Sequence, residues 1–176
     1  MHFDGFDFTG FWEESAYSRK FDGGPLTPEK IASAEAALGY KLPASYLQLL
    51  ETRNGGVPVN RCFPTGEPTS WADDHIAIET IFGVGKAAGN IVDETRLMVE
   101  EWGYPAIGIA ICDCPSAGHD EIFLDYRACG PQGEPKVVHV DQEDDYCITP
   151  LADTFEEFIR GLVNDSEFDF DEDEDE

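Results

Sequence analysis

The stretch that most constrains the fold runs from residue 102 to residue 141, where three successive strands are predicted, joined by two polar loops. Residues 106–111 form a nearly continuous apolar run, as in a strand that is buried on both faces. As strands, residues 121–126 would place Ile122, Leu124 and Tyr126 on one face, and residues 136–141 would place Val138 and Val140 opposite Val137 and His139. A sheet is therefore expected at the centre of this chain.

Two helices are predicted ahead of this sheet. Thr27 can cap the first helix, Pro28 suits its first position, and Gly39 can end it. The second helix begins near Pro43 and stops at residues 54–56, Asn-Gly-Gly, which tolerate positive φ. Helices connected this closely are expected to form a hairpin that lies against the sheet.

The other predicted elements complete an α+β chain. In order, they are a short strand at 57–60, a long loop at 61–74, a strand at 75–84, a helix capped by Asn90, an acidic loop at 141–150 and a last helix capped by Asp153. Helices gather at the two ends of the sequence and strands in the middle. This order favours an α+β fold with a single antiparallel or mixed sheet of about five or six strands and helices packed on one face.

Three regions differ in composition. Residues 1–24 are aromatic and acidic, so we expect part of this segment to dock on the domain, or to bind a partner or a second copy. Residues 25–164 should form the α+β domain. Residues 165–176 hold nine of the 37 carboxylates and no base, and are expected to be a disordered tail.

The net charge of −26 constrains the partners of this protein. Such a field repels nucleic acid and anionic lipid and attracts basic proteins, so direct nucleic-acid or membrane binding is not expected. An acidic surface can also serve solubility alone. The 15 residues at the start lack the basic and apolar parts of a secretory signal, and no apolar run is long enough to span a bilayer. Together with five irregularly spaced cysteines, this favours the cytoplasm.

The loop after the first central strand carries the most reactive side chains. Cys112, Cys114 and His119 could bind zinc, but the one-residue spacing of the cysteines is unlike common zinc sites. Cys114 and His119 could form a nucleophile pair with Asp113 or Asp120, but acidic surroundings oppose a thiolate. Acid clusters arise by chance among 37 carboxylates, so we expect no catalytic, cofactor or metal residues, and no cofactor.

A structural role suits these residues better. Gly118 permits a tight turn, and His119 and Asp120 can hold the loop by side-chain hydrogen bonds. Asp125 and Asp141 fall at predicted strand ends.

Several motifs, in this order, resemble the SUKH superfamily, which is built around the SMI/KNR-type domain. In the first part of the chain the matching positions are Glu35, residues 37–39 (ALG), Leu42, Pro43 and Tyr46 within LPASY, and Asn54, Gly55 and Gly56. In the second part they are Gly108, Gly118, His119, Asp120, residues 122–126 (IFLDY, with Asp125), residues 137–141 (VVHVD, with Asp141) and residues 155–158. The resemblance spans about residues 27–163. It implies an α+β fold and no catalytic activity for a typical bacterial member.

The resemblance also implies a function. Bacterial members are generally immunity proteins that bind and neutralise a cognate toxin domain, often a nuclease, whereas fungal relatives act as scaffolds in cell-wall regulation. We therefore expect a monomer or weak dimer that binds a cognate toxin or another basic protein and occludes its active site. The side chains predicted to bind the partner are Trp71, Trp102, Tyr104, Asp113 and Asp120. The alternatives are a regulatory scaffold unrelated to toxins, or a metal- or thiol-dependent enzyme that uses Cys112, Cys114 and His119.

Overall fold

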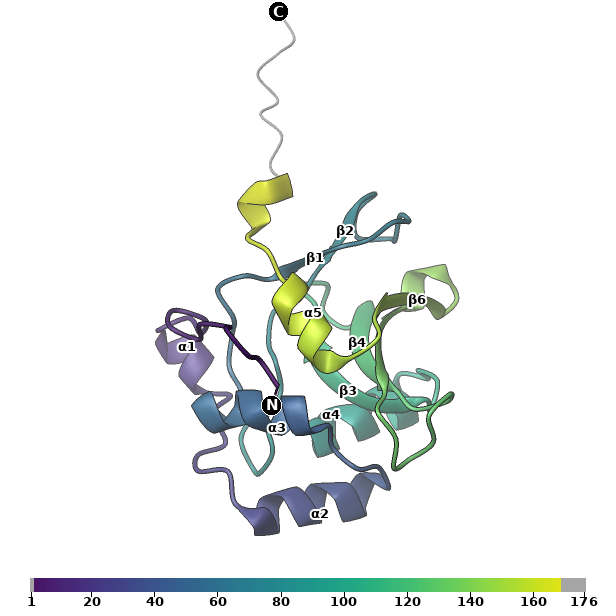
Figure 1. Cartoon of the computed structure of the whole chain (residues 1–176). Helices are drawn as coiled ribbons and strands as arrows, with labels where there is room; N and C mark the ends of the chain where they lie inside the picture. The colour runs from purple at the N-terminus through teal and green to yellow at the C-terminus, as the bar shows by residue number, and fades with distance from the viewer. Residues whose placement is uncertain (1, 169–176) are drawn as a thin grey trace, which may run out of the picture.

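A computed structural model describes residues 2–168, and its centre is a four-stranded antiparallel sheet in the order β3-β4-β5-β6 (Figure 1). The strands are β3 (Gly108–Asp113), β4 (Asp120–Asp125), β5 (Lys136–Asp141) and β6 (Cys147–Ala152). The three predicted central strands are confirmed. The acidic loop predicted at 141–150 is wrong in its second half, because β6 pairs there with β5 through its backbone although its side chains are half-buried or exposed.

A second, separate sheet corrects the prediction of one sheet of five or six strands. It pairs β1 (Cys62–Pro64) with β2 (His75–Ala77), so part of the predicted 61–74 loop is a strand. The predicted strand at 75–84 ends at Ala77. Beyond it the chain runs beside β3 without forming a strand: the N–H groups of Glu79 and Phe82 donate to β3 carbonyls at 2.9 Å, the Thr80 N–H donates to the Asp113 side chain at 2.7 Å, and Ile81 forms an isolated bridge.

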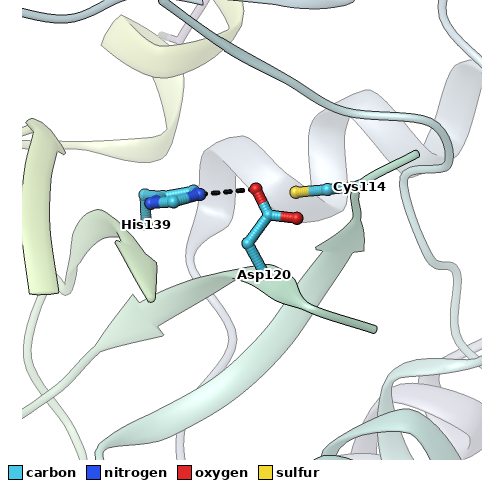
Figure 2. Close-up of side chains that lie close together, drawn as sticks. All are labelled: Cys114, Asp120 and His139. Carbon is cyan, nitrogen blue, oxygen red and sulfur yellow. Dashed lines mark hydrogen bonds and ion pairs between the residues drawn. The ribbon is translucent and has the colours of Figure 1, made fainter. Parts of the chain in front are cut away.

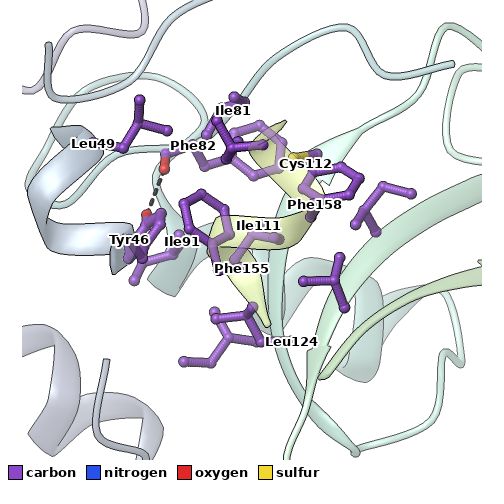
Figure 3. Packing of buried hydrophobic residues seen from close by; sticks show 14 of the residues in the cluster. Tyr46, Leu49, Ile81, Phe82, Ile91, Ile111, Cys112, Leu124, Phe155 and Phe158 are labelled. Atoms are coloured by element: carbon purple, nitrogen blue, oxygen red, sulfur yellow. Dashed lines mark hydrogen bonds between the residues drawn. The ribbon is translucent and has the colours of Figure 1, made fainter. Parts of the chain in front are cut away.

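Helices cover both faces of the main sheet, rather than one. They are α1 (Ala16–Arg19), α2 (Pro28–Leu38), α3 (Ala44–Thr52), α4 (Ile91–Arg96), which continues as the π-helix η1 (Leu97–Glu101), and α5 (Phe155–Gly161). Two short 3-10 helices, η2 (Gln142–Asp144) and η3 (Asp165–Phe168), follow β5 and α5. The larger apolar cluster packs α3 and α5 against one face of the sheet (Figure 3). A smaller cluster, with Met98 and Tyr104, covers the other face.

The predicted helix caps hold at two helices and shift at the third. Thr27 accepts the Lys30 N–H and Asn90 accepts the Asp93 N–H, as predicted. Helix α5 is capped by Thr154, which accepts the Glu157 N–H at 3.2 Å, and not by Asp153. Since the Glu157 carboxylate accepts the N–H of Asp153, the capping pattern lies one residue later than predicted.

Both ends of the described chain pack against the domain. Phe3 and Trp12 are buried, and the Phe3 N–H donates to the Glu156 carboxylate at 2.6 Å. At the other end, the first four residues of the predicted tail form η3, and the Phe168 ring stacks on His75. The rest of that tail lies outside the described residues.

Candidate functional site

Four loops meet at one end of the main sheet, and we call this surface the acidic loop end. It comprises residues 65–74, 101–105, 114–119 and 142–146. The sheet positions these loops. Because β3, β4 and β5 are antiparallel neighbours, the β3–β4 loop and the turn after β5 emerge at the same end of the sheet. The loop of the β1–β2 hairpin reaches this end from the second sheet.

Hydrogen bonds tie the four loops together. Ser70 donates its N–H and hydroxyl to the Asp141 carboxylate at 2.9 and 2.7 Å. The Gln142 N–H donates to the carbonyl of His119 at 3.0 Å, and the His119 ring forms an ion pair with Glu143. The Tyr146 hydroxyl donates to the Trp102 carbonyl at 2.6 Å. The acidic loop end is therefore a connected surface rather than four independent loops.

The acidic loop end exposes aromatic and acidic side chains. Trp71 and Trp102 are 41% and 37% exposed, as expected of partner-binding residues. Its carboxylates are exposed too: Glu67, Asp73, Asp74, Glu101, Glu143, Asp144 and Asp145. These four segments contain no lysine or arginine. Trp71 also lines a groove of about 400 Å³ together with Pro115, His75 and Phe168.

Two of the predicted partner-binding residues do not reach the surface. Tyr104 is 2% exposed because it packs on Phe123 and donates its hydroxyl to the Gly118 carbonyl at 2.7 Å. Asp120 is 1% exposed. The prediction of these two positions is corrected, since a buried side chain cannot contact a partner without unfolding the loop. Asp113, the last residue of β3, is half-buried.

Asp120 belongs to a buried polar cluster with Cys114 and His139 (Figure 2). His139 Nε2 lies 2.7 Å from an Asp120 carboxylate oxygen, and Cys114 lies on the other side of that carboxylate. Ser116 donates its hydroxyl to the same carboxylate and accepts the Asp120 N–H at 3.2 Å. Asp120 therefore holds the β3–β4 loop, as predicted.

The cluster differs from the one weighed in the sequence. His119 lies at the surface, so the predicted grouping of Cys112, Cys114 and His119 does not form. His139 takes its place, because β5 pairs with β4 and sets His139 opposite Ile122, next to Asp120 on the same face. The alternation of β5 could have placed His139 on this face, but only the strand register identifies its neighbour.

The cluster is not arranged for thiol chemistry. A nucleophile and its base need a direct hydrogen bond, with an acid behind the base. Here the carboxylate of Asp120 lies between the imidazole and the thiol. Burial, reinforced by Asp120 and Glu121, also raises the pKa of the Cys114 thiol well above its usual range. Burial likewise raises the pKa of Cys112. Neither thiol is therefore poised as a thiolate.

Buried carboxyls also line the opposite face of the sheet near this end. Burial raises the pKa of Asp113 to about 7, against the hydrogen bond from Thr80. Glu121 is fully buried, and among the described residues its carboxyl oxygens have no hydrogen-bond partner. Burial raises the pKa of Glu121 well above its usual range, with Glu94, Asp113 and Asp120 adding to the effect. Asp113 and Glu121 therefore keep their protons at a higher pH than ordinary carboxyl groups do.

The family-like positions form the frame behind this site. Tyr46 donates its hydroxyl to the Phe82 carbonyl at 2.5 Å. Asn54 donates to the Val84 carbonyl and accepts the Val84 N–H at 2.7 and 2.8 Å. A Cβ on Gly108 would lie 1.9 Å from the Leu124 carbonyl, so only glycine fits there. The other predicted positions divide by burial: Leu42, Pro43, Gly55, Gly56, Asp125 and Asp141 are buried, and Glu35 and Gly118 are half-buried.

A scan against protein-family models decides the affiliation. The model of the SMI1 / KNR4 family (SUKH-1) matches residues 25–161, most of the chain. The chain belongs to the SMI1/KNR4 family. No curated protein matched it in sequence. This SMI1/KNR4 domain thus comprises helices α2 to α5 and both sheets, while the segment with Phe3 and Trp12 lies ahead of the match.

Membership has consequences for function. An SMI1/KNR4 domain fits an immunity or a regulatory role, and the family is generally non-enzymatic. Among the described residues, no helix is long and apolar enough to cross a membrane.

Proposed function

We propose that this SMI1/KNR4 protein is a cytoplasmic, non-enzymatic immunity protein that binds a basic toxin domain, a nuclease, through the acidic loop end. The observation that supports the proposal most is the composition of that surface. Two exposed tryptophans stand among seven exposed carboxylates, with no lysine or arginine in the four loops.

The mechanism we propose is occlusion. Carboxylates at the rim attract a basic domain and raise its association rate, because opposite charges steer diffusional encounters. Trp71 and Trp102 then supply apolar contact area, since aromatic anchors carry much of the binding energy in protein interfaces. A nuclease cleft is basic because it binds phosphates, so an acidic protein seated over it excludes the nucleic-acid substrate.

The connected loops support this mechanism. The Asp141 bond to Ser70 holds the loop that carries Trp71, and the Tyr146 bond to the Trp102 carbonyl holds the backbone at the second tryptophan. A surface that is already ordered loses less conformational entropy when it binds.

The test is co-expression with the toxin encoded by a neighbouring gene. The proposal predicts that the full chain protects cells and that the two proteins elute together in gel filtration. The double variant Trp71→Ala/Trp102→Ala should protect less, whereas Tyr17→Ala, which removes an exposed aromatic side chain on α1, should protect fully. A full chain that neither protects nor forms a complex would overturn the proposal.

A second candidate is a regulatory scaffold unrelated to toxins. The fungal branch of the resemblance favours it, and the same acidic loop end would then bind a different basic protein. A gene without toxin genes nearby, together with a stable complex with an endogenous basic protein that depends on Trp71 and Trp102, would favour the scaffold.

A further inference from the structure

The buried cluster beneath the acidic loop end combines three metal-binding chemistries. The thiol of Cys114, a carboxylate oxygen of Asp120 and a ring nitrogen of His139 all lie within 4.8 Å of one another. The three side chains are 2%, 1% and 0% exposed. Neither family membership nor the proposed binding function gives this combination a role.

The sheet sets the spacing of these donors. Asp120 begins β4 and His139 lies within β5, the neighbouring strand, while Cys114 directly follows β3. All three donors are thus attached to paired strands or to a residue next to one. A site built this way is held in place before any ion enters.

We propose that Cys114, Asp120 and His139 bind one zinc ion, which fastens the base of the 114–119 loop beneath the acidic loop end. Thiolate, imidazole and carboxylate are all zinc ligands, whereas calcium and magnesium prefer oxygen donors alone. The donors of a tetrahedral zinc site lie about 3.4 Å apart. Small rotations of the side chains bring donors within 4.8 Å to that spacing.

The groups that act on the Cys114 thiol are Asp120, Glu121, Cys112 and Asp113, and none of them is a cation. A divalent ion would be the largest local charge in this site, and it stabilises the thiolate of Cys114 and the carboxylate of Asp120, which are its own ligands.

Zinc binding releases one proton. Zinc takes the thiol sulfur as a thiolate, and the thiol proton leaves to solvent. The Asp120 carboxylate exchanges its 2.7 Å hydrogen bond to His139 Nε2 for a bond to zinc. The imidazole then binds through Nε2 as the neutral tautomer that carries its proton on Nδ1. The three protein ligands leave the fourth position to a water molecule.

The first test uses the full chain, freed of metal by a chelator and then titrated with Zn²⁺ or Co²⁺. We expect one ion per chain by elemental analysis, and a thiolate-to-cobalt charge-transfer band in the near-ultraviolet spectrum. The melting temperature should rise with zinc and return on chelation. Absence of uptake, or a cobalt complex without the thiolate band, would overturn the proposal.

Matched variants assign the ion to the cluster. Cys114→Ala should weaken zinc binding roughly tenfold or more, since even outer-shell partners of a metal cost 10–100-fold in affinity. Cys112 is also buried and lies two residues earlier, in β3, so Cys112→Ala should retain binding. The double variant Cys129→Ser/Cys147→Ser, which removes the exposed thiols, should retain it too. If Cys114→Ala does not fold, Asp120→Asn supplies the same comparison with the shape conserved. Undiminished binding by the folded variant would contradict the assignment.

Discussion

Asp141 and Ser70 lie 71 positions apart in the chain, yet the carboxylate of Asp141 accepts both the N–H and the hydroxyl of Ser70, at 2.9 and 2.7 Å. The same carboxylate accepts the Glu143 N–H at 3.1 Å. These hydrogen bonds join the hairpin of the small sheet to the end of β5 in the main sheet and place Trp71 on the acidic loop end.

Ser70→Ala should loosen this connection locally. Loss of one hydrogen bond to a charged acceptor is expected to lower the free energy of unfolding by about 1–2 kcal/mol. In hydrogen exchange, the amides of residues 65–74 should lose protection while those of β4 and β5 keep theirs. Ser33→Ala, at an exposed position on α2, serves as the control. Unchanged protection in the loop would show that Asp141 does not hold it.

Tyr46→Phe tests the frame on which the sheet rests. Tyr46 is fully buried, and its hydroxyl is the donor to the Phe82 carbonyl. Without this hydroxyl the carbonyl is left unpaired in the core, so we expect a loss of about 1–3 kcal/mol in the free energy of unfolding, measured in urea. Tyr17→Phe, at a residue 43% exposed, should cost far less. Equal costs would contradict the importance of the Tyr46 bond.

Trp12→Ala tests whether the segment ahead of the family match is part of the fold. Trp12 is 7% exposed, and its indole N–H donates to the Thr52 hydroxyl at 2.9 Å. Removal of a buried tryptophan should cost about 3–5 kcal/mol of unfolding free energy. The matched control is Trp71→Ala, which removes a ring that is 41% exposed and should cost less than about 1 kcal/mol. A cost for Trp12→Ala as small as that of its control would show that the segment only rests on the surface.

The carboxyl of Asp113 predicts a pH dependence of stability. Burial raises its pKa to about 7 in the folded protein, and Glu79 and Glu94 oppose its ionisation, whereas in the unfolded chain an aspartate titrates near about 4. The folded state therefore binds the extra proton between these values. The stability that this group contributes is fully present below the lower pKa and is lost as the pH rises through 7.

Asp113→Asn should remove that dependence while its amide oxygen still accepts the Thr80 N–H. In urea unfolding at pH 5–8 with a chelator present, the wild-type protein should lose up to about 1.4 kcal/mol per pH unit more than the variant. Parallel curves for the two proteins would exclude a protonated Asp113.

The elements with strong local signals could be predicted from the sequence. Strand β5 occupies the predicted residues, 136–141. It lies between β4 and β6, and its valines supply apolar side chains for both faces of the sheet. Helix α2 begins and ends where Thr27, Pro28 and Gly39 indicate. In contrast, β6 lies on the edge of the sheet, and its backbone pairing with β5 needs no apolar pattern, so its residues resemble a loop.

The candidate site was predictable only in part. The exposure of Trp71 and Trp102 follows from loop positions, but the burial of Tyr104 and Asp120 depends on contacts with Gly118 and His139 that no local pattern encodes. The cluster with His139 requires the register of β4 and β5, in which a shift of one residue would place that imidazole on the other face of the sheet.

The most direct test of the central claim is calorimetric titration of the purified full chain with the basic toxin domain encoded beside it, at two salt concentrations. The account predicts a tight complex that weakens with salt, at least roughly 100-fold weaker binding for Trp71→Ala/Trp102→Ala, and unchanged binding for Tyr17→Ala. Equal affinity of the wild-type protein and the double tryptophan variant would contradict a binding site at the acidic loop end.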